Sequence, residues 1–448
     1  MRRHGIRILL TFLAGGLVAL LVGGIGGSLA ATRYADLALF TSVLDLVRQH
    51  HFEPIEEGRL LRGAVRGLLQ DLDPHSSFLE EDAFEETRVD SRGEFDGVGI
   101  EFTKRRDGLI EVISPIEGTP AARAGIRARD RIASICPTEP PEDWTEECRS
   151  TADMTLFQAV KLLRGPRGSK IAIEVLRRGL ELPQRYTLVR ELVQVVSVDG
   201  RMLEAGYAYV RLRIFQERTS DELKRVLEEL HDEAAGGFDG LVLDLRDNPG
   251  GLVVQAVEVA DAWLAEGLVV YTRGRVEAQR KEFRAHAGGT EPRYPIAVLV
   301  NEGTASSSEI VAGALQDQHR ALILGTKTFG KGSVQTVYPL EGGTGLRLTT
   351  ALYYTPSGRS IQEVGIPPDI PVEAAPGSEV EMDLTQSQHR TREQNLEGHL
   401  TRRDAEPQSG ADEASLEVPP AAESDLQLDR ALEILKTWSY FERLKWDR

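Results

Sequence analysis

Apolar strands and amphipathic helices alternate along the second half of the chain. Continuous apolar runs at GLVLDL (240–245) and PIAVLVN (295–301) predict strands that are buried on both faces. Apolar residues recur at helical spacing in three stretches around these runs: 219–234, 253–267 and 307–318. Because such alternation is typical of layered α/β folds, residues 191–372 are predicted to form an α/β core with a largely parallel sheet.

The first half of the chain shows two other patterns. Residues 34–92 predict a small helical region, whose second helix, from Leu60 to Leu72, is ended by Pro74. Its first helix carries apolar residues at helical spacing: Phe40, Val43, Leu44 and Val47. Residues 93–190 consist of short β-rich runs around one small helix, which predicts a compact β domain.

The end of the chain is acidic and poor in large apolar residues. Residues 373–424 are rich in Glu, Asp, Gln, Ser, Ala and Pro, which is the composition of a linker. Residues 425–448 predict a last amphipathic helix that docks on the body of the protein or on a second subunit. Its apolar face consists of Leu428, Ala431, Leu432 and Leu435.

The first 33 residues predict export. Basic residues precede an uncharged run from Ile8 to Thr32, which is longer than the core of a typical signal peptide and long enough to span a bilayer. Ser28-Leu29-Ala30 could still serve as a cleavage site, so a retained anchor and a cleaved signal both stay open. The chain is therefore expected at the periplasmic face of the inner membrane, or in the periplasm or medium after cleavage.

Charge and cysteine content narrow the range of functions that the sequence allows. A formal charge of -17 and a pI near 5.2 argue against nucleic-acid binding, which needs a basic face. The two cysteines, Cys136 and Cys148, share a Pro- and acid-rich loop, and export permits either a disulfide or two unpaired thiols. Two cysteines without clustered histidines are too few for a zinc site.

The stretch GTKTFGKGSVQ (325–335) resembles a phosphate-binding loop but lacks its context. Such a loop needs Ser or Thr after the lysine and a helix start there, whereas Gly332 follows Lys331 and SVQTVYPL predicts a strand. The other role for a lysine in an apolar setting is that of a base. Burial lowers its pKa, so a neutral amine can take a proton from a serine.

A candidate serine lies where a buried strand turns into a helix, at NEGTASSSEI (301–310). A hydroxyl there would lie beside unpaired backbone N–H groups that can stabilise an oxyanion. The alternative is that Thr304, Ser306, Ser307 and Ser308 only cap the helix. A Ser-His-Asp arrangement is disfavoured, because the nearest histidine, His319, falls at the far end of that helix.

A second strand-to-helix turn follows the strand at 240–245. It carries Asn248, Pro249, Gly250 and Gly251, and paired glycines can bring a backbone N–H close to a reacting carbonyl. A plain tight turn would have the same sequence.

Six motifs together resemble the carboxy-terminal processing (tail-specific) proteases. They occur in that family's order between Phe40 and Val372: LDPHSSFL, GVGIEF, LDLRDNPGG, VNEGTASSSEIVAGAL, GTKTFGKGSVQ and LYYTPSGRSIQEVGIPPDI. The resemblance implies a serine–lysine peptidase, with a layered α/β protease core, an inserted PDZ-like β domain, an N-terminal helical region and a C-terminal tail helix. It implies no metal, nucleotide or other cofactor.

The resemblance also implies roles for individual residues. The family's nucleophile lies 25 residues before its lysine, which pairs Ser306 with Lys331. The amide of Gln335 would hold the lysine in place. The oxyanion would be bound by the N–H of Ser307 and by one from Gly250 or Gly251.

In the β domain, the resemblance assigns Gly97, Val98, Gly99 and Ile100 to the loop that binds a C-terminal carboxylate, beside a strand edge that pairs with the peptide. Two features depart from the family's pattern. Thr304 and Ser307 stand where Ser and Ala are commoner, and the loop CPTEPPEDWTEEC is unusually long.

The expected function is therefore that of an exported endopeptidase that binds protein tails and cleaves near their C-termini. The alternative is a catalytically silent PDZ scaffold, and a nucleotide-binding protein is the more distant rival. Expected partners are proteins with accessible C-termini and, through the N-terminal segment, the membrane. A second copy of the chain and a regulatory adaptor protein are further possible partners.

Overall fold

The computed structural model describes most of the chain between residues 37 and 446. The described ranges are 37–105, 108–138, 144, 146–179, 182–234, 237–373, 392–401 and 425–446. They fall in two compact units, Met1–Asp71 and Leu72–Arg448. The predicted N-terminal anchor at residues 1–33 lies outside the described ranges. Among the helices that are described, none is long and apolar enough to cross a bilayer.

The first unit is helical, as its apolar spacing predicts. One helix covers residues 37–50 and the next, α2, covers Glu57–Gln70. Several large apolar side chains of these helices are exposed in the single chain: Leu37, Leu39, Phe40, Val43, Leu46, Leu61, Val65 and Leu68.

The second unit is built on a six-stranded sheet whose core is parallel, as predicted. Its strand order is β10-β11-β12-β15-β16-β19, and every neighbouring pair is parallel except β10 with β11. The strands are β10 (Val198–Glu204), β11 (Tyr207–Leu212), β12 (Gly240–Asp244), β15 (Ile296–Val300), β16 (Leu322–Gly325) and β19 (Ile370–Pro371). Strands β12 and β15 are buried along their whole length, which is why they read as unbroken apolar runs.

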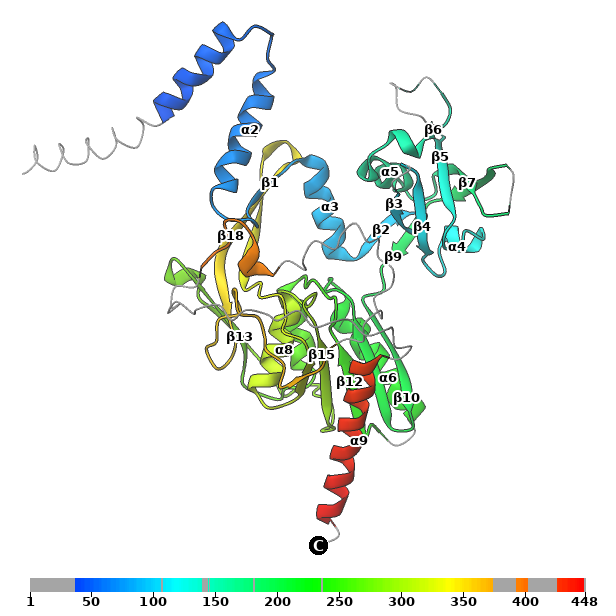
Figure 1. Cartoon of the computed structure of the whole chain (residues 1–448), viewed down its shortest axis with the longest axis vertical. Helices are drawn as coiled ribbons and strands as arrows, with labels where there is room; N and C mark the ends of the chain where they lie inside the picture. Colours follow the sequence, from blue (N-terminus) through cyan, green and yellow to red (C-terminus); the bar gives the residue numbers. More distant parts are fainter. Residues whose placement is uncertain are drawn as a thin grey trace, which may run out of the picture. The chain divides into compact units, whose positions relative to one another are not determined.

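Helices cover both faces of this sheet (Figure 1). Helices α6 (Thr219–Ala234), α7 (Val253–Asp261) and α8 (Ser307–Asp317) share the larger hydrophobic core with one face. Helix α9 (Leu426–Trp446) packs on the other face through Ala431 and Leu435, so the predicted C-terminal helix docks on the body of the protein.

A second, antiparallel sheet is the main departure from the predicted alternation. Its order is β1-β18-β13-β14, with β17 paired to β18. The strands are β1 (Ser77–Leu79), β13 (Leu268–Gly274), β14 (Lys281–Arg284), β17 (Ser333–Pro339) and β18 (Gly345–Tyr354). Strand β13 reads like one more strand of the parallel sheet. It pairs with the nearby β14 and with β18, which lies more than 70 positions away in the chain, so local patterns do not identify its place in this sheet.

Residues of the predicted β domain form a separate small core. The strand order of its sheet is β3-β4-β5-β7-β8, with β6 beside β5. Strands β2 and β9 pair with each other where the chain enters and leaves this domain. The strands are β2 (Glu94–Gly97), β3 (Ile100–Lys104), β4 (Ile110–Pro115), β5 (Arg131–Pro137), β6 (Arg149–Ser150), β7 (Lys170–Leu176), β8 (Gln184–Val189) and β9 (Glu191–Gln194). Helices α4 (Pro120–Arg123) and α5 (Leu156–Leu163) complete it, and a disulfide joins Cys136 to Cys148.

Two further elements lie outside these cores. Helix α3 (Glu81–Arg92) follows β1, and a short segment, Arg392–Thr401, carries one turn of 3-10 helix at Glu393–Asn395. The structure differs here from the predicted linker of residues 373–424, because the side chain of Glu393 is fully buried. The residues that bind the Glu393 side chain come from distant parts of the chain, so the local composition gives no sign that this side chain is buried.

Candidate active site

Two strand-to-helix turns meet at the carboxyl edge of the parallel sheet, after β12 and after β15. The hydrogen bonds that join them include Thr304 Oγ1 to Leu245 O (2.8 Å), Ala305 N to Asn248 O (3.0 Å), Ser308 Oγ to Asn248 O (2.7 Å) and Ser307 Oγ to Gly251 O (2.8 Å). The hydroxyls of Thr304 and Ser307, where the sequence departs from the family pattern, are thus used to hold the turns together.

Ser306 differs from the hydroxyl residues around it in two ways. Its hydroxyl donates to no residue in the part of the chain that the structure describes, whereas those of Thr304, Ser307 and Ser308 all donate to backbone carbonyls. Its φ is +55°, a left-handed conformation that costs a non-glycine residue free energy and is concentrated at functional sites. The strained turn presents one unengaged hydroxyl at the start of α8.

Gly250 lies directly against this serine. A Cβ added at Gly250 would come within 2.8 Å of Ser306 Cβ and 2.9 Å of Ser307 N, and its φ of +100° also favours glycine. The N–H of Gly250 donates to Asn248 Oδ1 at 2.9 Å. The N–H groups of Gly251 and Ser307 have no acceptor among the described residues, so both are free to donate to a bound group.

A buried glutamate links the serine to the lysine loop. Glu309, on the first turn of α8, is fully buried and its Oε2 accepts from the N–H of Ser306 at 2.8 Å and from the N–H of Lys331 at 2.9 Å. Its Oε1 accepts from Gly330 N (2.8 Å) and Thr328 Oγ1 (2.5 Å). One carboxyl group therefore fixes the backbone of Ser306 relative to that of Lys331.

The same burial sets the protonation of Glu309. Removal from water raises the pKa of Glu309 to about 7, although the hydrogen bonds from Thr328, Gly330, Ser306 and Lys331 act in the opposite direction.

Lys331 is partly buried, and burial lowers the pKa of its amine. Charges around it act in both directions: Glu393 raises this pKa, Arg347 lowers it, and Glu309 and Asp73 raise it. No hydrogen bond joins the Lys331 amine to Ser306 or to any other described residue. Glu309 thus fixes the two backbones relative to each other, while the two functional groups are not hydrogen-bonded in this structure.

The predicted contact between Gln335 and Lys331 is not made. The amide nitrogen of Gln335 instead donates to Ser333 Oγ at 2.9 Å and, more weakly, to Thr349 Oγ1 at 3.5 Å. A β-bulge between Val334 and Gln335 shifts the register of β17 against β18 at this point. Sequence spacing alone gives no sign of this bulge.

Two charged residues beside the glycine turn had no predicted role. Asp244 is fully buried at the end of β12, where its carboxylate accepts from Tyr209 Oη (2.8 Å) and from the guanidinium of Arg246 (2.6 Å). Arg246 also binds Asp425 at the start of α9 (2.8 Å). In the sequence, Asp244 and Glu309 could each have been noticed as a charged residue within an otherwise apolar element.

In the β domain, the predicted carboxylate loop lies at the edge of the sheet. Strand β3 is the end strand of its sheet, so one side of it is unpaired there. The carbonyls of Val98 and Gly99 accept from Ala121 N and Ile116 N, both at 3.0 Å, whereas the N–H groups of Val98 and Gly99 have no acceptor among the described residues. The loop thus offers donors to a ligand.

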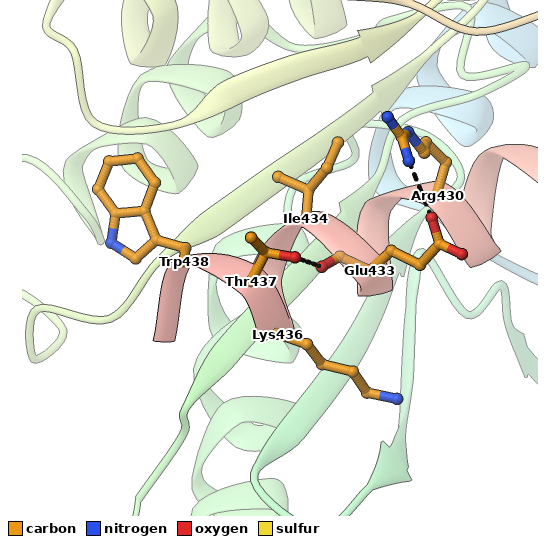
Figure 2. Close-up of a pocket in the computed structure, with 6 residues that line it drawn as sticks. All are labelled: Arg430, Glu433, Ile434, Lys436, Thr437 and Trp438. Atoms are coloured by element: carbon orange, nitrogen blue, oxygen red, sulfur yellow. Dashed lines mark hydrogen bonds and ion pairs between the residues drawn. The ribbon is translucent and has the colours of Figure 1, made fainter. Parts of the chain in front are cut away.

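Other hollows and clusters do not add to this site. Figure 2 shows a surface hollow along α9, lined by Arg430, Glu433, Ile434, Lys436, Thr437 and Trp438. Within the described ranges, the one group of His, Cys, Asp or Glu side chains close enough to share a metal ion is Cys136, Cys148 and Glu174, and its sulfurs form the disulfide.

Similarity to known proteins identifies the family of this chain. Residues 206–372 match the profile of Peptidase family S41. The chain is 41% identical over 405 residues to a carboxy-terminal-processing protease of Bartonella bacilliformis, which covers 90% of this chain and 89% of that protein. It is 36% identical over 316 residues to a carboxyl-terminal-processing protease of Synechocystis sp., with 69% of this chain and 70% of that protein covered.

Among solved structures, the photosystem II D1 C-terminal processing protease is 30% identical, with a TM-score of 0.44 over 76% of this chain and 93% of that chain. On the sequence identities, the chain belongs to the carboxy-terminal processing proteases of peptidase family S41.

Proposed function

We propose that the protein is an exported serine endopeptidase that cleaves protein substrates near their C-termini with Ser306 as nucleophile and Lys331 as base. The observation that carries the assignment is the carboxyl group of Glu309, which accepts from the backbone N–H of both residues and so ties the head of α8 to the lysine loop. The positive φ and the unengaged hydroxyl of Ser306 support the choice of nucleophile.

The first half of the reaction forms an acyl-enzyme. The neutral amine of Lys331 takes the proton of the Ser306 hydroxyl as its oxygen attacks the scissile carbonyl carbon. The negative charge moves to the carbonyl oxygen, which accepts from the N–H groups of Ser307 and Gly251. The C–N bond then breaks, and the Lys331 ammonium gives its proton to the leaving amine.

The second half releases the other product. Water loses a proton to the Lys331 amine and attacks the ester carbonyl. The intermediate collapses, the proton returns to the serine oxygen, and the substrate leaves with a new carboxylate. The partial burial of Lys331 favours this cycle, because it lowers the pKa of the amine and so increases the fraction of free amine.

Substrate selection is assigned to the β domain. In this proposal a substrate's terminal carboxylate accepts from the N–H groups of Val98 and Gly99, and its last residues add a strand to the unpaired side of β3. The domain would then act as a PDZ module. Export through the N-terminal segment would place the enzyme at the periplasmic face of the inner membrane, or in the periplasm if the segment is cleaved.

The direct test uses the purified full chain and an unstructured protein with an apolar C-terminus. The wild type should cleave it, and Ser306→Ala and Lys331→Ala should each abolish cleavage while leaving the thermal unfolding temperature near that of the wild type. The same substrate with an amidated C-terminus should be cleaved with a raised KM. A wild type that binds the tail but cleaves nothing would indicate a scaffold instead, and full activity in Lys331→Ala would exclude the mechanism.

A further inference from the structure

The segment Arg392–Thr401, here called the tail segment, contacts both sides of the lysine loop. The N–H of Glu393 donates to Phe329 O (3.3 Å), two residues before Lys331. Gln362 bridges to the other side: its Oε1 accepts from Gly332 N (3.0 Å) and its Nε2 donates to Glu393 Oε1 (2.8 Å). The tail segment thus places a buried carboxylate against the lysine loop.

The carboxylate of Glu393 is held as an anion. His75 Nε2 lies 2.8 Å from its Oε2, and burial, which alone would raise its pKa, is outweighed by His75, Gln362 and Lys331, so that the pKa of Glu393 is lowered. The ionised carboxylate in turn favours the charged form of Lys331.

Several polar contacts attach the tail segment to the body of the protein. Besides those of Glu393, its contacts include Gln362 Nε2 to Leu400 O (3.1 Å) and His399 Nε2 to Glu363 Oε1 (2.9 Å). None of its residues belongs to the hydrophobic cores of the described chain. A segment that contributes no residue to these cores can leave without opening one.

Those other elements are integral parts of the fold. Lys331 faces Glu309 from α8, Asp73 from the turn before β1 and Arg347 from β18. Asp73 accepts from Ser76 Oγ at 2.7 Å and Thr349 Oγ1 at 3.0 Å, which fixes it to β18. Glu309 is thus fixed in α8 and Asp73 is fixed to β18, whereas Glu393 is supplied by the tail segment.

We propose that the tail segment is an inhibitory strap: docked, it supplies the Glu393 carboxylate that holds Lys331 as an ammonium ion, and its release frees the amine to act on Ser306. The inference rests on the proposed Ser–Lys mechanism. Glu393 is therefore a regulatory residue that acts through Lys331 and does not touch the substrate.

The test is the pH dependence of kcat/KM for the full chain and its Glu393→Gln variant. Activity should rise with pH as Lys331 loses its proton, and the substitution should move this rise to lower pH by about one unit. Below the rise, that shift gives about a tenfold gain in kcat/KM, because one pKa unit is a tenfold change in the fraction of free amine. Glu397→Gln removes the same charge from an exposed position of the same segment and should leave the profile unchanged.

Two further measurements keep the outcomes distinct. Deleting residues 392–401 should shift the profile in the same direction, even if Glu393→Gln folds poorly. The Lys331 signal of ¹³Cε-lysine-labelled protein should titrate at lower pH in Glu393→Gln than in the wild type. An unshifted profile and an unshifted NMR titration would overturn the strap while Ser306→Ala stays inactive, whereas an active Ser306→Ala would overturn the proposed function itself.

Discussion

Replacing Gly250 with alanine should inactivate the enzyme by moving the turn that carries the nucleophile. The new Cβ would lie 2.8 Å from Ser306 Cβ and from Ala305 O, about 0.6 Å closer than an ordinary contact of 3.4 Å. A shift of that size takes an oxyanion donor outside its working range of about 2.7–3.1 Å. Loss of one such donor lowers kcat by about 10²–10³-fold, equivalent to about 3–4 kcal/mol.

Gly237→Ala is the matched control. Gly237 has a similar φ of +89°, but a Cβ there meets no atom within 4 Å. In both variants, alanine in a left-handed backbone conformation lowers the unfolding free energy by about 1–2 kcal/mol, so both should unfold at lower temperature. Only Gly250→Ala should also lose kcat. Steady-state kinetics on one peptide substrate and differential scanning calorimetry measure the two effects. If both variants kept wild-type kcat, Gly250 would not position the nucleophile.

Four further outcomes are expected. In the wild type, the unfolding free energy should fall by up to about 3 kcal/mol as pH rises from 4.5 to about 7, because a pKa raised in the fold stabilises the protein only while the group is protonated. Glu309→Gln should abolish this fall, and urea titrations at several pH values measure it. Lys331→Arg should be inactive at every pH up to 10 in a peptidase assay, because a guanidinium does not release its proton. Reduction of the Cys136–Cys148 disulfide should destabilise the β domain by about 3 kcal/mol in urea titrations without changing hydrolysis of a short peptide. Arg246→Ala should lower the unfolding temperature, since it leaves the buried Asp244 carboxylate without its cation.

The parallel sheet and its helices could be predicted because their signals are local. Strands β12 and β15 are apolar throughout since both faces are covered, and the repeat in α6 follows from its one buried face. The position of Ser306 at the head of α8 followed from the same pattern, because a strand-to-helix turn must present its first residues at the sheet edge.

The contacts that organise the site could not be predicted, because they join distant parts of the chain. Glu309 and Lys331 are 22 positions apart, and Glu393 reaches His75 across 318. The contact expected for Gln335 depended on strand register, which a single bulge changed. For Glu309, the local sign of a buried carboxylate was a charged residue within an otherwise apolar helix.

The central claim, that an uncharged Lys331 amine activates Ser306, is tested most directly by the rate at which a fluorophosphonate reacts with the protein. Mass spectrometry should find one adduct per chain, on the Ser306 peptide, formed at a rate that rises with pH. The Lys331→Met variant, with a side chain of similar length but no base, should react at least about 100-fold more slowly. An equal rate in that variant, or an adduct on another residue, would contradict the account.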